Sequence, residues 1–355
     1  MFAIGLVTLV AGAQFLVRGA SKLALSFGIS PLVLGLTVVA FGTSAPELAV
    51  SVRSAWGGQV DIALGNVVGS NIFNVLFILG VSALIAPLVV APQLIRQEVP
   101  FMLGASLLLF ALALDGGIGR MDGALLFGLL VTYIVFLIRQ SRAQSQATRD
   151  EHAQGFAAPD ATGWDRHWSM QLALVGCGLA LLVLGANWLV DAAVTFARAL
   201  GLSEMVIGLT IVAVGTSLPE VATSLVATLR GERDIAVGNV IGSNTFNILG
   251  VLGVSSLVAP TELQVAQAML RFDMLVMIAV ALACLPIFFS GHGISRWEGA
   301  LFLFYYVAYT AFLLLAAQQH DALATYGAVM LTVVLPLTAL TLAVIAARYW
   351  RARQR

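Results

Sequence analysis

The sequence predicts an all-α polytopic membrane protein built from two inverted five-helix repeats, followed by an eleventh, C-terminal helix. Three observations predict this fold class: the composition, the length of the apolar segments and an internal repeat. Hydrophobic residues make up 60% of the 355 residues and charged residues only 10%, whereas soluble domains carry roughly 25% charged residues. Because such a chain has too little polar surface to face water, we expect a bilayer as its solvent. The net charge of zero gives no indication of a nucleic-acid partner.

Eleven apolar segments are long enough to cross the hydrocarbon core as helices, which takes about 20 residues each. The predicted spans are 2–22, 30–52, 62–88, 98–114, 121–139, 169–197, 204–229, 235–259, 269–289, 297–317 and 323–347. One long polar stretch, from Arg139 to Trp168, separates the first five spans from the rest. Since it contains few apolar residues, we expect a flexible linker between two halves of the chain.

The basic residues predict the orientation, because cytoplasmic loops of membrane proteins are enriched in Lys and Arg. If the linker is cytoplasmic, the N-terminus lies outside and the C-terminus inside. Fourteen of the eighteen Lys and Arg residues then lie on the cytoplasmic side, and only Arg53, Arg120, Arg198 and Arg271 lie outside. The opposite topology would invert this ratio, so the sequence favours a cytoplasmic linker.

The internal repeat aligns residues 28–87 with residues 201–260 without a gap, at a constant offset of 173, and 35 of these 60 positions are identical. Weaker similarity on both sides extends the repeat to five spans per half. Because five is odd, the second half enters the membrane from the opposite side, and the halves are inverted. Inverted repeats recur in secondary transporters, whose substrate site lies near the midplane where the copies meet. A duplication without a transport role would not explain why the shared residues are polar.

Each half contains a glutamate within an apolar span. Glu47 is the only ionisable residue in the interior of the second span, and Glu220 holds the same position in the seventh. An acidic residue at that depth is costly unless it is compensated, so it is a candidate for an ion or proton pathway. A structural role, such as capping at a helix break, is the alternative. That role explains poorly why the glutamate recurs with its whole Gly-Thr-Ser-x-Pro-Glu neighbourhood.

The residues before each glutamate supply oxygen ligands. Pro46 has no N–H, and its ring displaces the carbonyl of Gly42, so the backbone oxygens from Ala40 to Thr43 become available to a cation. Thr43 and Ser44 add hydroxyl groups. The second half repeats this arrangement with Ala213, Gly215, Thr216, Ser217 and Pro219. Irregular backbone at this depth is tolerated only where it faces protein or a polar cavity.

A second polar cluster follows in the third and eighth spans. It consists of Asn66, Ser70, Asn71 and Asn74, matched by Asn239, Ser243, Asn244 and Asn247. Ser70 and Asn74 are four residues apart, as are Ser243 and Asn247, so each pair shares one helix face. We expect this face to line the site. For the other four asparagines, hydrogen bonds that only hold helices together are an equally good explanation.

All of these ligands are hard oxygens, which suit Ca²⁺ or Na⁺ better than soft metals. Two facing glutamates carry a charge that one Ca²⁺ or two Na⁺ would neutralise. A site that must hold either ion, and is unstable without one, provides a physical basis for exchange. Two adjacent carboxylates also favour the binding of a proton by one of them, so protons are competitors.

The GTSxPE segments at 42–47 and 215–220 and the GNxxGSNxFN segments at 65–74 and 238–247 resemble the alpha repeats of the sodium/calcium exchangers, within the calcium/cation antiporter superfamily. The resemblance covers roughly residues 1–317. It implies ten core helices, a cytoplasmic central linker and Na⁺-driven Ca²⁺ transport by alternating access. The linker is too short for the large regulatory Ca²⁺-binding domains of animal relatives, which indicates a prokaryotic type.

Carried over by position, the resemblance implies that Glu47 and Glu220 are the central Ca²⁺ ligands, shared with Na⁺, and that Asn74 and Asn247 complete the centre. The flanking Na⁺ sites would be built by Thr43, Ser44, Thr216, Ser217, Ser70 and Ser243, together with the carbonyls of Ala40 and Ala213. Some family members have an aspartate at the position of Asn247. Its absence here leaves two central carboxylates and argues, by resemblance, against a K⁺-co-transporting member.

The sequence therefore predicts a secondary active Na⁺/Ca²⁺ antiporter in a bacterial or archaeal plasma (inner) membrane. It is expected to be a transport protein and not an enzyme, with Ca²⁺, Na⁺ and the lipid bilayer as partners and no cofactor. The predicted domains are a membrane repeat at 1–140, a cytoplasmic linker at 141–167, a second membrane repeat at 168–317 and an extra helix with a basic tail at 318–355.

Three other functions are alternatives to this prediction. A Ca²⁺/H⁺ or other cation/H⁺ antiporter on the same scaffold would be favoured by acidic and His relays along the path, and the spans contain few such residues. An intramembrane protease would need paired catalytic aspartates or a zinc motif within the spans, and the sequence has neither. A passive channel fits paired inverted sites less well than alternating access does.

Overall fold

The computed structural model describes residues 1–27, 30–152, 167–199, 213–289, 292–338 and 340–341. The elements of the first half are α1 (Phe2–Phe27), α2 (Pro31–Leu34), η1 (Gly35–Val39), α3 (Ala40–Thr43), α4 (Ala45–Trp56), α5 (Val60–Phe73), η2 (Asn74–Leu79), α6 (Gly80–Ile85), β1 (Leu88–Val89), η3 (Leu94–Glu98), α7 (Val99–Leu112), η4 (Ala113–Asp115), β2 (Gly117–Ile118) and α8 (Arg120–His152). The elements of the second half are α9 (Trp168–Ala199), α11 (Ala213–Gly215), α12 (Leu218–Leu229), α13 (Arg233–Phe246), η6 (Asn247–Leu252), α14 (Gly253–Val258), β3 (Leu263–Gln264), η7 (Met269–Asp273), α15 (Met274–Phe289), β4 (Gly293–Ile294), α16 (Arg296–Ala317), α17 (Ala322–Val329) and η8 (Met330–Val334).

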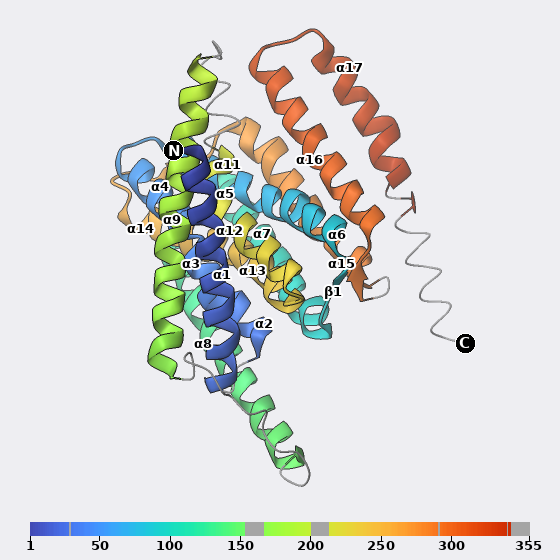
Figure 1. The fold of residues 1–355 in the computed structure, drawn as a ribbon. Helices are drawn as coiled ribbons and strands as arrows, with labels where there is room; N and C mark the ends of the chain where they lie inside the picture. The colour runs from blue at the N-terminus through green and yellow to red at the C-terminus, as the bar shows by residue number, and fades with distance from the viewer. Residues whose placement is uncertain (28–29, 153–166, 200–212, 290–291, 339, 342–355) are drawn as a thin grey trace, which may run out of the picture.

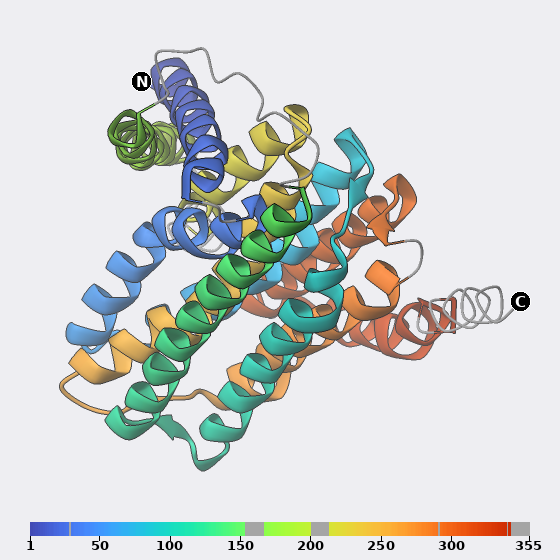
Figure 2. The same ribbon diagram turned by 90° about the horizontal axis from the view of Figure 1, so that it is seen from below.

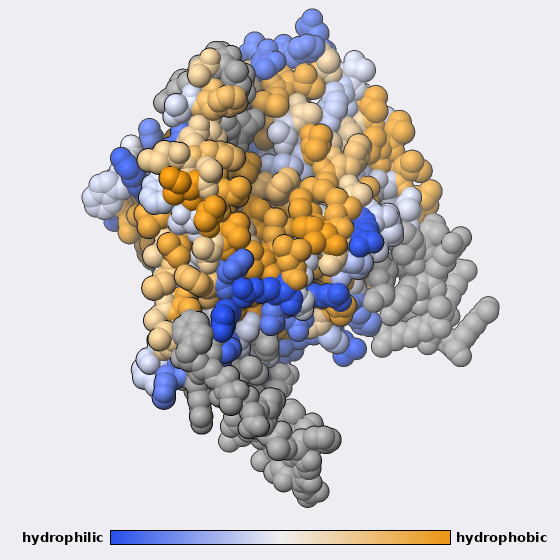
Figure 3. All heavy atoms as spheres, in the orientation of Figure 1, coloured by the Kyte–Doolittle hydropathy of each residue, from blue (hydrophilic) through white to orange (hydrophobic). Residues whose placement is uncertain are grey.

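The helices confirm an all-α polytopic membrane protein. Eight helical segments of the described residues are long and apolar enough to cross a bilayer, and the bent pair Leu32–Thr43 and Ala45–Trp56 makes a ninth. Two shorter apolar helices, Leu218–Leu229 and Ala322–Thr338, occupy the seventh and eleventh predicted spans. Residues 204–212, 339 and 342–347 of those two predictions lie outside the described residues. Figure 3 shows a broad hydrophobic band between hydrophilic ends, as expected for a protein surrounded by lipid.

The third and eighth spans lie at the centre of the bundle. Of the residues in their most apolar windows, 72% are buried in Val60–Ile85 and 100% in Arg233–Val258, against 11–39% in the other long spans. These two spans carry the Gly- and Asn-rich motifs. Their burial explains how polar side chains are accommodated in the membrane, because protein surrounds them and lipid does not.

The predicted linker begins as helix. Helix α8 continues to His152 and extends beyond the rest of the bundle (Figure 1). The expectation of a flexible linker starting at Arg139 was therefore wrong for the residues up to His152. The physical reason is that this stretch contains no Gly or Pro and is rich in Ala, Gln and Arg, which favour helix. Residues 153–166 lie outside the described residues.

The element boundaries repeat together with the sequence. Helices α5, η2 and α6 correspond residue for residue to α13, η6 and α14 at the offset of 173. Further along, η3 corresponds to η7 at an offset of 175, and α8 and α16 begin 176 residues apart. The π-helical turns at Asn74–Leu79 and Asn247–Leu252 recur at the same place in both halves. The repeat is therefore structural as well as sequential.

Two short antiparallel sheets show that the halves are inverted. Strand β1 pairs with β4, and β2 pairs with β3. The repeat relates β1 to β3 and β4 to β2, so exchanging the halves converts one sheet into the other. Since β1 follows the third span and β2 follows the fourth, which runs in the opposite direction, the two sheets lie at opposite ends of the bundle. Inversion is the relation that the odd number of spans predicted.

Helices α1 and α9 form an antiparallel pair at one edge of the bundle, where both views show them side by side (Figures 1 and 2). Their backbones touch through glycines seven residues apart. A Cβ atom at Gly12 would lie 2.7 Å from the backbone nitrogen of Leu182, and one at Gly178 would lie 2.6 Å from that of Leu16. Only glycine permits so close an approach, as in other membrane helix pairs. The pair has its own hydrophobic cluster, beside the larger one of the remaining spans.

Candidate functional site

The first Gly-Thr-Ser-x-Pro-Glu segment bends the second span by 47° between Leu32–Thr43 and Ala45–Trp56. At the bend, Ser44 has φ −81° and ψ 9°, outside the helical range. Pro46 has no N–H, so it cannot satisfy the carbonyl four residues earlier. Helix α4 starts immediately after the bend, with Glu47 in its first turn. The positive end of the helix dipole therefore lies beside the carboxylate and stabilises its charge.

The second segment has the same local geometry. Ser217 separates α11 from α12 with φ −87° and ψ 7°, and Pro219 follows at the start of α12. Glu220 lies in the first turn of α12. Ala213 begins α11 at the edge of the described residues. Each glutamate is thus placed by a serine bend and a proline at a helix start.

The two glutamates meet in one buried site, because each is bound by the serine of the other half. The Ser217 hydroxyl donates to Glu47 Oε1 and the Ser44 hydroxyl donates to Glu220 Oε1, both at 2.8 Å. Both glutamates and both serines have 0% exposure. The structure therefore brings the two halves of the motif together at the centre, as inversion of the repeat requires.

The other predicted hydroxyls surround this pair. Thr43 donates to Asn239 Oδ1 at 3.1 Å, and Thr216 donates to Asn66 Oδ1 at 3.3 Å. Thr43 is fully buried, and Thr216 is partly buried. The threonine of each half is therefore held by an asparagine of the other half, so these asparagines support the motif loops.

The central spans supply the remaining side chains. Ser70 Oγ lies 3.2 Å from Ser217 Oγ, and since the single Ser217 proton goes to Glu47, Ser70 is the donor of this contact. Asn74 follows one turn later at the start of η2 and is fully buried, as is its counterpart Asn247 at the start of η6.

The carbonyl of Ala40 is less free than the sequence suggested. It accepts the backbone N–H of Ser44 at 3.0 Å and lies 3.4 Å from the Thr43 hydroxyl. A carbonyl oxygen has two lone pairs, so one of these contacts would be replaced if the Ala40 oxygen bound a cation.

Several oxygens at the site are buried without any hydrogen-bond donor. They are Glu47 Oε2, Glu220 Oε2, Asn74 Oδ1, Asn247 Oδ1 and Ser243 Oγ. Buried acceptors are almost always paired in proteins, so a cluster of unpaired ones needs a compensating partner. A hard cation supplies one for all of them. Among the residues that the structure describes, no group of three or more His, Cys, Asp or Glu could hold a metal, so the donor set here consists of two carboxylates and neutral oxygens.

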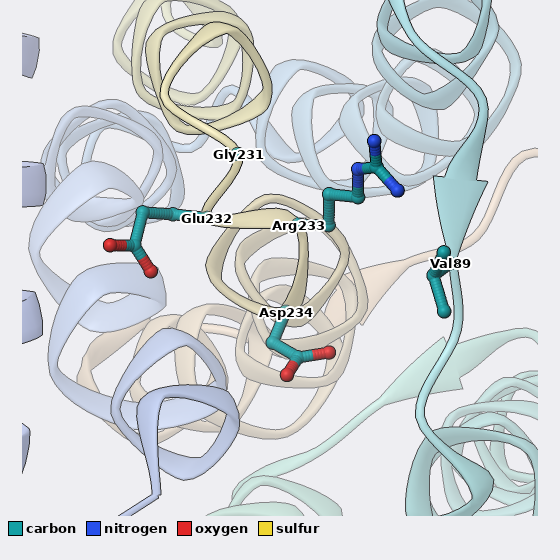
Figure 4. A pocket seen from close by; sticks show the side chains of 5 residues that line it. All are labelled: Val89, Gly231, Glu232, Arg233 and Asp234. Atoms are coloured by element: carbon teal, nitrogen blue, oxygen red, sulfur yellow. The ribbon is translucent and has the colours of Figure 1, made fainter.

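A cavity of about 320 Å³ lies at the end of the bundle, near β1 and apart from the glutamates (Figure 4). It is lined by Val89, Gly231, Glu232, Arg233 and Asp234. The side chain of Arg233 points toward the side on which Val89 lies, whereas that of Glu232 points the other way (Figure 4). The motif glutamates are fully buried, so the central site is occluded from this cavity in this structure.

Sequence reasoning missed a second pair of intramembrane acids. Glu98 in η3 is 1% exposed and accepts hydrogen bonds from Tyr133 of α8 and from Gln93. Its counterpart Asp273 in η7 accepts a hydrogen bond from Tyr309 of α16 at 2.8 Å. Each acid therefore ties a span to the one that follows it. The signal was present in the sequence, because Glu98 and Asp273 each follow an arginine by two residues at an offset of 175.

The family described as sodium/calcium exchanger protein matches the chain over residues 1–139 and 170–315. CaxA of Alkalimonas amylolytica is 41% identical over 311 residues, which cover 86% of this chain and 95% of that protein. Inner membrane protein YrbG of Escherichia coli is 37% identical over 285 residues, which cover 79% of this chain and 86% of YrbG.

A solved structure of the sodium-calcium exchanger NCX_Mj, soaked with Na⁺ and Ca²⁺, superposes with a TM-score of 0.74 at 33% sequence identity. The superposition covers 87% of this chain and 96% of that one. The family match includes both motif-bearing halves of the chain.

Proposed function

We propose that this chain, which belongs to the sodium/calcium exchanger protein family, exchanges Na⁺ for Ca²⁺ across its membrane by alternating access. Membership makes it an ion antiporter and an integral membrane protein. The coupling of Ca²⁺ specifically to Na⁺, the ligands and the orientation are the parts that we propose. They are supported by the chemistry of the buried site.

The observation that carries the proposal is the cluster of unpaired buried oxygens around Glu47 and Glu220. Their two carboxylates carry a charge that one Ca²⁺ or two Na⁺ would cancel. With both cations absent, two like charges would face each other in a low-dielectric environment. Binding of either Ca²⁺ or Na⁺ stabilises the site. Release of one ion is therefore more favourable when the other ion replaces it than when the site is left empty. The oxygens of Asn74 and Asn247 complete the central Ca²⁺ position.

The flanking Na⁺ positions follow from the hydroxyls next to each carboxylate. Na⁺ binding would use the remaining predicted ligands, namely Thr43, Ser44, Ser70, Thr216, Ser217 and Ser243 with the carbonyls of Ala40 and Ala213. Ser44 and Ser217 now donate their protons to the glutamates, so each hydroxyl keeps at least one lone pair for a cation, even with Ser70 bonded to Ser217.

In the proposed topology the two membrane repeats are 1–140 and 168–317, with the linker 141–167 in the cytoplasm and the N-terminus outside. The segment 318–355 adds an eleventh transmembrane helix, followed by a basic tail on the cytoplasmic side. The asymmetry of Lys and Arg supports this orientation. The likeness to YrbG supports a prokaryotic inner membrane.

The test is transport by the purified protein in liposomes loaded with Na⁺. We expect uptake of radioactive Ca²⁺ to require an outward Na⁺ gradient and to stop when the Na⁺ gradient is dissipated. The control is the same liposomes with a pH gradient and equal Na⁺ on both sides. Uptake that follows the pH gradient and ignores Na⁺ would refute the proposal in favour of a Ca²⁺/H⁺ antiporter.

A further inference from the structure

Two buried asparagines that touch neither glutamate join the halves where α5 crosses α13. Asn71 Nδ2 donates to the backbone oxygen of Asn244 at 3.3 Å, and Asn244 Nδ2 donates to the backbone oxygen of Asn71 at 3.1 Å. The exposed fractions of the two residues are 2% and 3%. This reciprocal pair resembles the polar contacts that hold membrane helices together, but its amide oxygens make further contacts.

Those amide oxygens hold the two central asparagines, each from the other half. Asn244 Oδ1 accepts from Asn74 Nδ2 at 3.0 Å, and Asn71 Oδ1 accepts from Asn247 Nδ2 at 3.2 Å. The Oδ1 atoms of Asn74 and Asn247 are buried and have no donor. An amide that served only to join helices would have both ends bonded, so the free oxygens indicate another partner.

The orientation of each of the four side-chain amides is fixed by a backbone carbonyl, which can accept a hydrogen bond but cannot donate one. A backbone carbonyl only accepts, so Asn244 must turn its Nδ2 toward Asn71 and its Oδ1 toward Asn74. Asn74 must then offer its Nδ2, which leaves its Oδ1 directed elsewhere. The same reasoning, started from the carbonyl of Asn244, fixes Asn71 and then Asn247. The reversed rotation would place two amide oxygens against each other.

We propose that Asn71 and Asn244 are positioning residues that make Asn247 and Asn74, respectively, present oxygen and not NH₂ to the transported Ca²⁺. This inference rests on the proposed function. Each half thereby orients the neutral ligand of the other half. A reversed amide would direct a positive dipole at the cation, so the pair acts on Ca²⁺ affinity without touching the ion.

A double-mutant cycle in proteoliposomes tests this role. Removing a residue that orients a metal ligand costs about 10–100-fold in affinity, so we expect Asn71→Ala to raise the KM for Ca²⁺ about tenfold and to change kcat less. An aspartate at position 247 has oxygen at both ends, so its rotation no longer matters. In the Asn247→Asp background, we therefore expect Asn71→Ala to raise the KM less than about threefold.

The matched control is the same Asn71→Ala change in an Asn74→Asp background. Asn74 is held by Asn244 and not by Asn71, so the full effect, about tenfold, should persist there. The mirror-image cycle exchanges the roles: Asn244→Ala should be relieved by Asn74→Asp and not by Asn247→Asp. Equal effects of Asn71→Ala in all three backgrounds would overturn the proposal and leave a purely structural contact.

If Asn71→Ala does not fold, Asn71→Asp replaces it, since a protonated aspartic acid keeps an oxygen facing Asn247 Nδ2 and a hydroxyl donor facing the Asn244 carbonyl. Its KM should then stay within about threefold of the wild-type value, and a rise as large as that expected for alanine would contradict the proposal. Wild-type transport separates this test from the test of function. If the wild type shows no Na⁺-driven Ca²⁺ uptake, the exchange activity is refuted. If the wild type exchanges the ions but Asn71→Ala has the same effect in all three backgrounds, only the positioning role is refuted.

Discussion

The two halves make equivalent contacts at Glu47 and Glu220. Around the glutamates, however, the hydrogen bonds and the burial of corresponding residues differ between the halves. Each Oε1 accepts a serine proton from the other half at 2.8 Å. One step outward, Ser70 is bound to Ser217, whereas Ser243, the counterpart of Ser70, interacts with the Glu220 side chain. Thr43 is fully buried, and Thr216 is only partly so.

A second difference between the halves concerns α9, which belongs to the second half but lies against the motif bends of both halves. A Cβ atom added at Gly42 would lie 2.5 Å from the side chain of Leu179, and one added at Gly215 would lie 2.4 Å from that of Val190. Two identical halves would open identically toward both sides of a membrane. The proposed alternating access would need a centre that is shared and surroundings that differ, and the unequal surroundings of the two glutamates are consistent with it.

The largest effect should come from the shared centre. Glu47→Gln and Glu220→Gln each remove half of the central charge and should each lower Na⁺-driven Ca²⁺ uptake at least about a hundredfold, since losing one buried charge partner costs roughly 3–5 kcal/mol. Equal losses in both variants are the expected sign of equivalence. Uptake is measured in proteoliposomes.

The control for this pair is Glu262→Gln, which changes an exposed glutamate in the segment before β3. It should leave uptake unchanged. Normal exchange by either central variant would show that the carboxylates are not both ligands.

The equivalence of the glutamates could be predicted from the sequence, because the motif recurs without a gap and the odd span count inverts the copies. The same inversion makes the contact of Ser44 with Glu220 equivalent to that of Ser217 with Glu47. The asymmetry could not be predicted. Ser70 and Ser243 are identical residues in nearly identical contexts, and only the packing of the whole bundle decides that Ser70 contacts a serine and Ser243 a glutamate.

The roles of the asparagines were also undetermined by the sequence. Asn71 lies three residues before Asn74, yet its amide holds Asn247 of the other half. Spacing along one helix shows which side chains share a face, but it does not show which end of an amide faces a neighbour. The continuation of α8 to His152 was missed because polarity was interpreted as flexibility, although no residue there breaks a helix.

A smaller effect should distinguish the two serines. Ser217→Ala removes the donor to Glu47 and also the partner of Ser70, whereas Ser44→Ala removes only the donor to Glu220. Hydrogen bonds to charged groups contribute about 1.5–3 kcal/mol. We expect both variants to raise the Na⁺ concentration needed for half-maximal exchange about tenfold or more, and Ser217→Ala to raise it by the larger factor because it also loses the contact with Ser70. Equal shifts would mean that the contact with Ser70 has no functional weight.

The smallest effect concerns the acid–tyrosine pairs, which recur in both halves but differ in burial. Tyr133→Phe keeps the ring stacked on Phe101, whose centroid lies 4.2 Å away, and removes only the donor to Glu98. An unsatisfied buried acceptor costs about 1–3 kcal/mol, so Tyr133→Phe should lower the unfolding temperature in detergent.

Tyr309→Phe should lower that temperature less, because Asp273 is only partly buried and is less enclosed by protein than Glu98. Both variants should retain Na⁺-dependent exchange, since neither tyrosine touches the site. A greater loss of stability in Tyr309→Phe than in Tyr133→Phe would show that burial does not set the importance of these pairs. Loss of exchange with unchanged stability would instead give the second pair of acids a role in transport.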